Sequence, residues 1–168
     1  MKNKILALGL ILALSYPLQA LTLKETIHAT QQALLEKNTK VVYQNIALQG
    51  IVNSKIKKFT RLAKKQDSLA GKMIGWSEPL LLKSATGFIM GEFNRSSRGL
   101  RQSYLNSFQL GKVVENGAYG YATATFLGAK AVLSAVKDNN GNWQIVGAES
   151  PVLDKEFNNL LKILKATK

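Results

Sequence analysis

A change in the spacing of apolar residues near Glu92 constrains the fold of this chain more than any other feature. Up to about residue 93, apolar side chains recur three and four residues apart, which is typical of helices that bury one face. From Tyr104 to Ala148 they tend instead to alternate, which is typical of strands. Helices followed by a run of antiparallel strands indicate an α+β domain, with helices on one face of a sheet.

Several segments have the features of helices. Thr22 and Glu25 fit a capping box, in which each side chain bonds the backbone N–H of the other residue. Ser77, Glu78 and Pro79 are typical of a helix start, and the helix after them is expected to be the most buried, since apolar residues cover more than half of its circumference. The expected helices are 22–38, 51–65, 78–93 and 153–165.

The second half of the chain predicts strands and one clear hairpin. Asn140-Gly141 between two apolar runs is the strongest short-range signal of a hairpin turn. Residues 43–50 are expected to be a junction between helices, and residues 94–103 a polar, basic connector. The expected strands are 104–110, 119–127, 129–137 and 143–148.

Residues 1–20 have the parts of a secretory signal peptide. Two lysines precede an apolar h-region at residues 5–14, and a small residue, Ala20, ends the segment. We expect cleavage near Ala20 and export, to a periplasmic or extracellular location, with residues 21–168 as a single α+β domain. An uncleaved anchor or a buried helix is the alternative, although the h-region is shorter than the roughly 20 apolar residues that span a bilayer.

Charge and cysteine content narrow the classes of partner and chemistry. The chain has no cysteine, which excludes disulfides, thiolate metal sites, a cysteine nucleophile and a lipoprotein anchor. Its net charge is +13, and loss of the two lysines in residues 1–20 leaves +11. Such a charge favours anionic partners, and for an exported protein these are envelope lipids or acidic proteins rather than nucleic acid. Plain solvation is the alternative explanation. No transmembrane segment is expected after residues 1–20 are removed.

Two parts of the chain resemble known folds and families. Residues 131–137, the Asn-Gly turn and the strand Trp143-Gln144-Ile145 resemble the last hairpin of nuclear-transport-factor-2-like and cystatin-like folds. Residues 39–59, with Tyr43 followed by a Lys-rich helix, are similar to a family of small exported bacterial proteins of unknown function. Members of that family often have Asp two residues after the Tyr, where this chain has Asn45.

The resemblance, over roughly residues 25–150, implies a fold and a pocket. The fold is α+β: N-terminal helices packed on a C-terminal curved antiparallel sheet, with a final C-terminal helix. A cone-like pocket lies between helices and sheet in such folds, which serve as enzymes, lipid carriers or scaffolds. We expect a binding protein without a cofactor, whose pocket holds a lipid-like or anionic amphipathic ligand. The expected pocket residues are Leu81, Phe88, Glu92, Phe126 and Trp143.

Cations crowd one broad face of the helix predicted at 51–65, and its apolar face is expected to pack on the sheet. We predict an anionic docking surface here, which attracts the ligand head group or an envelope surface. In the alternative function, the chain is an interaction protein that docks an acidic partner through this basic helix. The cations of the predicted surface are Lys55, Lys57, Lys58, Arg61, Lys64, Lys65, Arg95, Arg98 and Arg101.

Catalytic chemistry has weaker support in the sequence. His28 is the only histidine, and no nucleophile-elbow sequence accompanies it. Glu92 follows Phe88 and Ile89 in an apolar helix, so burial would raise its pKa and suit general acid–base work, whereas pairing with Arg95 would not. Carboxylates at metal-ligand spacing are absent from the sequence. The sequence therefore favours a non-enzymatic binding protein, with an enzyme centred on Glu92 or His28 as a third hypothesis.

Overall fold

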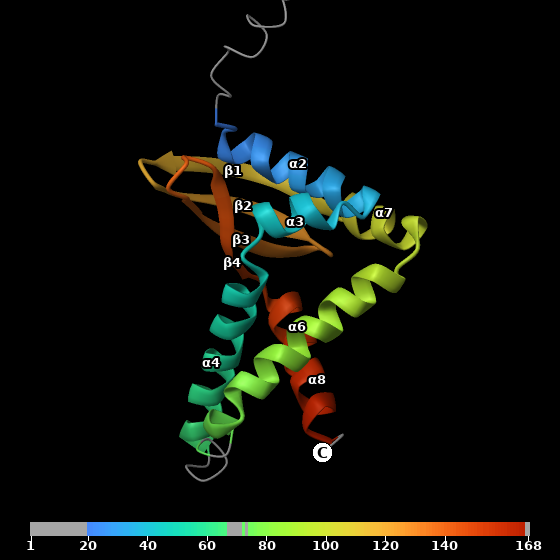
Figure 1. The fold of residues 1–168 in the computed structure, drawn as a ribbon, viewed down its shortest axis with the longest axis vertical. Helices are drawn as coiled ribbons and strands as arrows, with labels where there is room; N and C mark the ends of the chain where they lie inside the picture. Colours follow the sequence, from blue (N-terminus) through green and yellow to red (C-terminus); the bar gives the residue numbers. More distant parts are fainter. Residues whose placement is uncertain (1–19, 67–71, 73, 167–168) are drawn as a thin grey trace, which may run out of the picture.

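The computed structural model describes residues 20–66, 72 and 74–166, apart from the side chains of residues 66 and 161–166. Helices come first, then an antiparallel sheet, then a last helix, which confirms the predicted α+β class (Figure 1). Residues 1–19 of the predicted signal peptide lie outside the described residues. The elements are α2 (Leu23–Glu36), α3 (Thr39–Asn45), α4 (Leu48–Gln66), α6 (Glu78–Arg95), α7 (Arg98–Asn106), β1 (Phe108–Asn116), β2 (Tyr119–Phe126), β3 (Ala129–Lys137), β4 (Trp143–Glu149) and α8 (Pro151–Ala166).

The described strands form one sheet in the order β1-β2-β3-β4, with antiparallel neighbours. The turn between β3 and β4 contains Gly141 at φ +81°, a conformation that glycine adopts without strain. The Asp138 carboxylate accepts hydrogen bonds of 2.8 Å from the backbone N–H groups of Asn140 and Asn142, which lower its pKa. Strands 119–127, 129–137 and 143–148 are thus confirmed to within a residue at each end.

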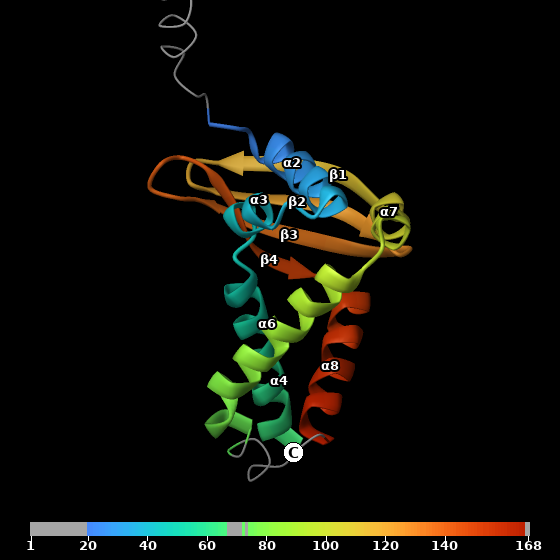
Figure 2. The same ribbon diagram turned by 45° about the vertical axis from the view of Figure 1, so that its right-hand side comes forward.

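Helix α2 lies across one face of the sheet, beside α3 (Figures 1 and 2). The capping box of Thr22 and Glu25 is present, and Leu23 and Ile27 pack on the sheet residues Ala122 and Trp143 in one hydrophobic core. The two layers approach so closely at Gly120 that a Cβ there would lie 2.7 Å from Leu23 Cδ2. The first helix is confirmed, and it covers part of one face of the sheet.

A second core lies where α4, α6 and α8 pack together, beyond the β4 edge of the sheet (Figure 2). Val52 and Ile56 of α4 contact Leu81 and Ala85 of α6, and Leu160 of α8 completes the cluster. The apolar face of α4 therefore packs mainly on helices. The prediction that it packs on the sheet is wrong, because α4 extends away from the sheet after its first turns.

Helix α6 is less buried than its composition predicts. Only Leu81 and Ala85 are buried along its length, whereas Leu80 and Phe88 are almost half exposed. It contacts α4 and α8 but crosses them at an angle, so much of its apolar surface has no helix against it (Figure 1). The prediction that this is the most buried helix is wrong, since α2 buries five side chains. Among the described residues, none of the helices combines the length and hydropathy that crossing a bilayer requires.

Helices occupy most of the predicted junction (43–50) and connector (94–103). The short helix α3 and the first turn of α4 take up the junction, and the end of α6 and the short helix α7 take up the connector. Asn38 caps α3 by accepting a hydrogen bond from Val41 N, and Ser97 caps α7 in the same way from Leu100 N. The prediction of a strand over residues 104–110 is wrong for its first half, because α7 continues to Asn106 and β1 follows it.

Candidate functional site

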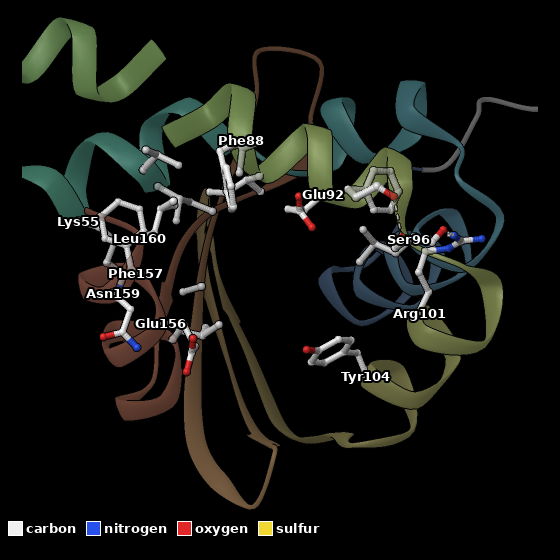
Figure 3. Close-up of a pocket in the computed structure, with 18 of the residues that line it drawn as sticks. Lys55, Phe88, Glu92, Ser96, Arg101, Tyr104, Glu156, Phe157, Asn159 and Leu160 are labelled. Carbon is white, nitrogen blue, oxygen red and sulfur yellow. Dashed lines mark hydrogen bonds between the residues drawn. The ribbon is translucent and has the colours of Figure 1, made fainter. Parts of the chain in front are cut away.

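A cavity of about 750 Å³ lies where α4, α6, α7 and α8 meet beside the last strand (Figure 3). Its walls are mainly apolar. Each helix contributes one side: Ile51 from α4, Phe88 and Phe93 from α6, Leu105 from α7 and Phe157 from α8. Because α6 leans away from α4 and α8, the three helices leave this space between them instead of closing into a tight bundle.

Polar groups lie toward two opposite ends of the cavity (Figure 3). Lys55, Glu156 and Asn159 lie at one end, on α4 and α8. Glu92, Ser96, Arg101 and Tyr104 lie toward the other, on α6, α7 and the link between them. An apolar middle with polar ends suits an amphipathic molecule, which has both kinds of surface.

At the first end, Lys55 and Lys58 of α4 converge on Asp154 in the first turn of α8. Their ammonium nitrogens lie 2.5 and 2.9 Å from the two carboxylate oxygens. Burial alone would raise the pKa of Asp154, but the hydrogen bonds and charges of the two lysines outweigh it and hold the pKa below its ordinary value. The hydrogen bond to Asp154 raises the pKa of Lys58. Lys55 and Lys58, which the sequence assigns to a docking surface, therefore link α4 to α8.

At the second end, the guanidinium of Arg101 is held by backbone groups. Its Nε and Nη2 donate to the carbonyl oxygen of Leu35 at 3.0 and 2.9 Å, and Nη1 donates to the carbonyl oxygen of Ser96 at 2.6 Å. Leu35 lies in the last turn of α2, where carbonyl groups lack helical partners. Arg101 thus links α2 to α7. It lies at the edge of the cavity, and most of its N–H donors are already used in these hydrogen bonds.

The predicted pocket residues are divided among different parts of the structure. Phe88 and Glu92 line the cavity. Leu81 and Trp143 are buried in the two cores, and Phe126 stacks on Tyr104, with ring centroids 6.3 Å apart. The cavity lies among helices and reaches the sheet only at its edge, unlike the predicted pocket between helices and sheet.

The sequence reasoning left out the walls from α7 and α8. Leu100, Tyr104 and Leu105 are spaced as one face of a helix, which is the signal that finds them. On α8, Phe157 and Leu160 belong to the apolar stripe that predicts a helix. Their inward direction depends on how α8 packs against α4.

The remaining predicted cations are exposed on α4, α6 and α7. Lys57 and Arg61 line a polar depression of about 470 Å³, together with Glu149 and the ion-paired Lys58. The rest are distributed as follows: Lys64 and Lys65 lie in the last turn of α4, Arg95 is ion-paired with Glu92 on its own helix, and Arg98 is exposed in the first turn of α7.

The groups of the enzyme hypothesis do not converge. Glu92 is more than half exposed and pairs with Arg95. His28 is exposed on α2, where its Nδ1 lies 3.0 Å from Gln31 Oε1. In the described part of the chain, His, Asp and Glu side chains do not gather in threes around a possible metal position.

Comparison of the chain with protein-family models, with curated proteins and with solved structures finds no match. Any assignment of function therefore rests on the geometry and charge of the molecule itself.

Proposed function

We propose that this chain is an exported, non-enzymatic protein that holds a lipid-like or anionic amphipathic ligand in the cavity between α4, α6, α7 and α8. The observation that carries the proposal is an apolar cavity of about 750 Å³. This volume is within the range of roughly 300–1,000 Å³ that is usual for small-molecule sites. Export rests on the signal peptide predicted at residues 1–20, with cleavage near Ala20 and a periplasmic or extracellular location.

The walls supply the free energy of binding in this proposal. Phe88 is 42% exposed although it lines the cavity, and a bound acyl chain would remove its ring from water. Each Å² of apolar surface removed from water contributes about 25 cal/mol. The apolar walls come from four separate helices, so a ligand with one flexible apolar chain can adapt its shape to contact all of them.

The charge of the protein favours an anionic head group. Lys55 and Arg101 lie at the two polar ends, and the net charge of +11 that remains without residues 1–20 attracts anions to the molecule as a whole. Both side chains are already engaged with protein groups, so the head group is expected at the mouth, where solvent also reaches it.

A matched pair of variants on α6 tests the proposal. A fluorescent fatty acid is titrated into the wild type, Phe88→Gln and Leu80→Gln. Phe88 lines the cavity and Leu80 does not, although their exposures, 42% and 49%, are similar. We expect Phe88→Gln to weaken binding about tenfold, since the apolar contact of a ring is lost. Leu80→Gln is expected to stay within about twofold. Absence of probe binding, or equal losses in both variants, would contradict the proposal.

The polar depression on α4 favours a second candidate function, docking of an acidic protein through the basic helix. Lys57 and Arg61 are exposed there and form no ion pair within the described residues. Their double reversal to Glu should abolish binding of a polyglutamate peptide. The control is a double reversal of Lys112 and Lys130, two exposed lysines of the sheet, because it changes the net charge equally. Equal losses would show only a general charge effect and would contradict a specific surface.

A further inference from the structure

Trp76 is 83% exposed, although the large indole ring is highly buried in most folded proteins. It lies in a short helical stretch two residues before α6. The first turn of α6 is at the end of the bundle of α4, α6 and α8 that is farthest from the sheet (Figures 1 and 2). An indole combines a large apolar surface with one N–H donor, and it is enriched where membranes meet water. The exposure of Trp76 therefore indicates a surface that binds a partner or a membrane.

The side chains near Trp76 in the sequence and at the same end of the bundle are mostly apolar or cationic. We define the Trp76 end as residues 62–66, 72 and 74–83. Leu62 and Leu80 are each about half exposed, which adds apolar surface to that of the indole. Glu78 is the one acid among the described residues of this end. Against it stand four exposed lysines: Lys64, Lys65, Lys72 and Lys83.

We propose that the Trp76 end docks on the surface of an anionic bilayer, with the indole at head-group depth and the lysines against lipid phosphates. Charge complementarity selects this occupant, because exposed Trp and Leu together with several lysines are the composition of interfacial membrane anchors. Contacts between proteins instead tend to be depleted in lysine. Docking is independent of the cavity ligand, since none of these residues lines the cavity.

Vesicle binding and tryptophan fluorescence test the proposal. Vesicles of phosphatidylcholine are compared with vesicles of equimolar phosphatidylcholine and phosphatidylglycerol. We expect binding to the anionic vesicles only, and its loss in about 1 M salt, where the screening length is about 3 Å. Trp76 emission should shift to the blue and be quenched by lipids brominated on their acyl chains. Trp143, the only other tryptophan, is 2% exposed in the core and should not respond.

Two variant pairs locate the contact. Trp76→Ala should lower partitioning at least about tenfold, because a large apolar contact is lost. Tyr119→Ala is its control, since Tyr119 is 71% exposed on β2, in the sheet. The double variant Lys64→Gln/Lys72→Gln should lower binding about 25-fold, at roughly fivefold for each cation. Lys112→Gln/Lys130→Gln on the sheet removes the same charge and should have little effect.

The proposal is overturned if Trp76→Ala and Tyr119→Ala bind equally, if neutral and anionic vesicles bind equally, or if a polyglutamate peptide but no vesicle shifts Trp76 emission. The last result would identify an acidic protein as the partner. Both the full chain and the chain that begins at Leu21 are used, because the apolar stretch at residues 5–14 can itself bind lipid. Circular dichroism confirms that each variant is folded.

Discussion

The ammonium nitrogen of Lys55 on α4 lies 2.5 Å from a carboxylate oxygen of Asp154 on α8, and only 10% of the Lys55 side chain is exposed. The sequence places Lys55 among docking cations, whereas the structure uses it to hold two helices together beside the cavity. Lys58 binds the other carboxylate oxygen from the exposed side. Asp154 therefore helps to hold α8 in position, and α8 forms one wall of the proposed ligand site.

Replacement of Asp154 by Asn should destabilise the fold by about 1–3 kcal/mol, because it leaves the poorly exposed Lys55 without a charged partner. Urea denaturation measures the loss. Glu149→Gln is the control, since it removes only a 3.7 Å contact with Lys58 between exposed side chains. An Asp154→Asn variant as stable as the control would contradict the assigned role.

The same carboxylate predicts how stability depends on pH. Its pKa is lower in the folded protein than the ordinary value of 3.8, so it binds a proton less readily when folded. Its contribution to stability is then fully present above that ordinary value and is lost as the pH falls through the folded value. Melting temperatures measured downward from pH 6 should fall more steeply for the wild type than for Asp154→Asn. Parallel curves would contradict the prediction.

Arg101 provides a second test of a side chain that the sequence assigns to docking. Arg101→Ala leaves the carbonyl groups of Leu35 and Ser96 without their donors and should cost about 1–3 kcal/mol. Arg101→Lys should recover only part of that loss, because an ammonium group cannot reproduce the planar fork of a guanidinium. Chemical denaturation compares the two variants. Losses below about 0.5 kcal/mol in both would indicate a surface role.

Two glycine substitutions test the packing of α2 on the sheet. Gly120→Ala places a Cβ 2.7 Å from Leu23 Cδ2 and 3.1 Å from the Trp143 ring, so we expect a loss of about 1–3 kcal/mol. Gly87→Ala, inside α6, meets no atom within 4 Å and should be neutral or stabilising by up to about 1 kcal/mol. Thermal denaturation of both variants measures the difference, and an equal response would contradict the close contact at Gly120.

The strands and long helices follow from local patterns, and the short helices do not. Apolar and polar residues alternate along β2, β3 runs up to the turn that Gly141 marks, and β4 follows that turn, so the bounds of these strands are predictable to a residue. Helix α7 is short and buries no side chain, so the helical spacing of Leu100, Tyr104 and Leu105 is a weak signal beside the polar and basic residues that predict a connector. The register of β1 shifts between Leu110 and Val113, and this irregularity hides the second half of the strand.

The cavity depends on tertiary structure that no local pattern contains. Phe88 and Glu92 are predictable as candidates because they share one helix. Tyr104 and Phe157 line the cavity only because α6 crosses at an angle and α8 packs beside α4. The Lys55–Asp154 pair helps to set the position of α8. From the sequence, Trp143 is as good a pocket candidate as Phe88. In the structure it is instead buried in the core between α2 and the sheet.

Native mass spectrometry of the protein purified from its own envelope tests the central claim most directly. We expect the wild type to carry the added mass of one lipid-like molecule, and Trp76→Ala to carry it as well, because that end of the bundle does not line the cavity. Phe88→Gln should carry much less. Consistently bare wild-type protein, or added mass that Phe88→Gln leaves unchanged, would contradict a ligand in this cavity.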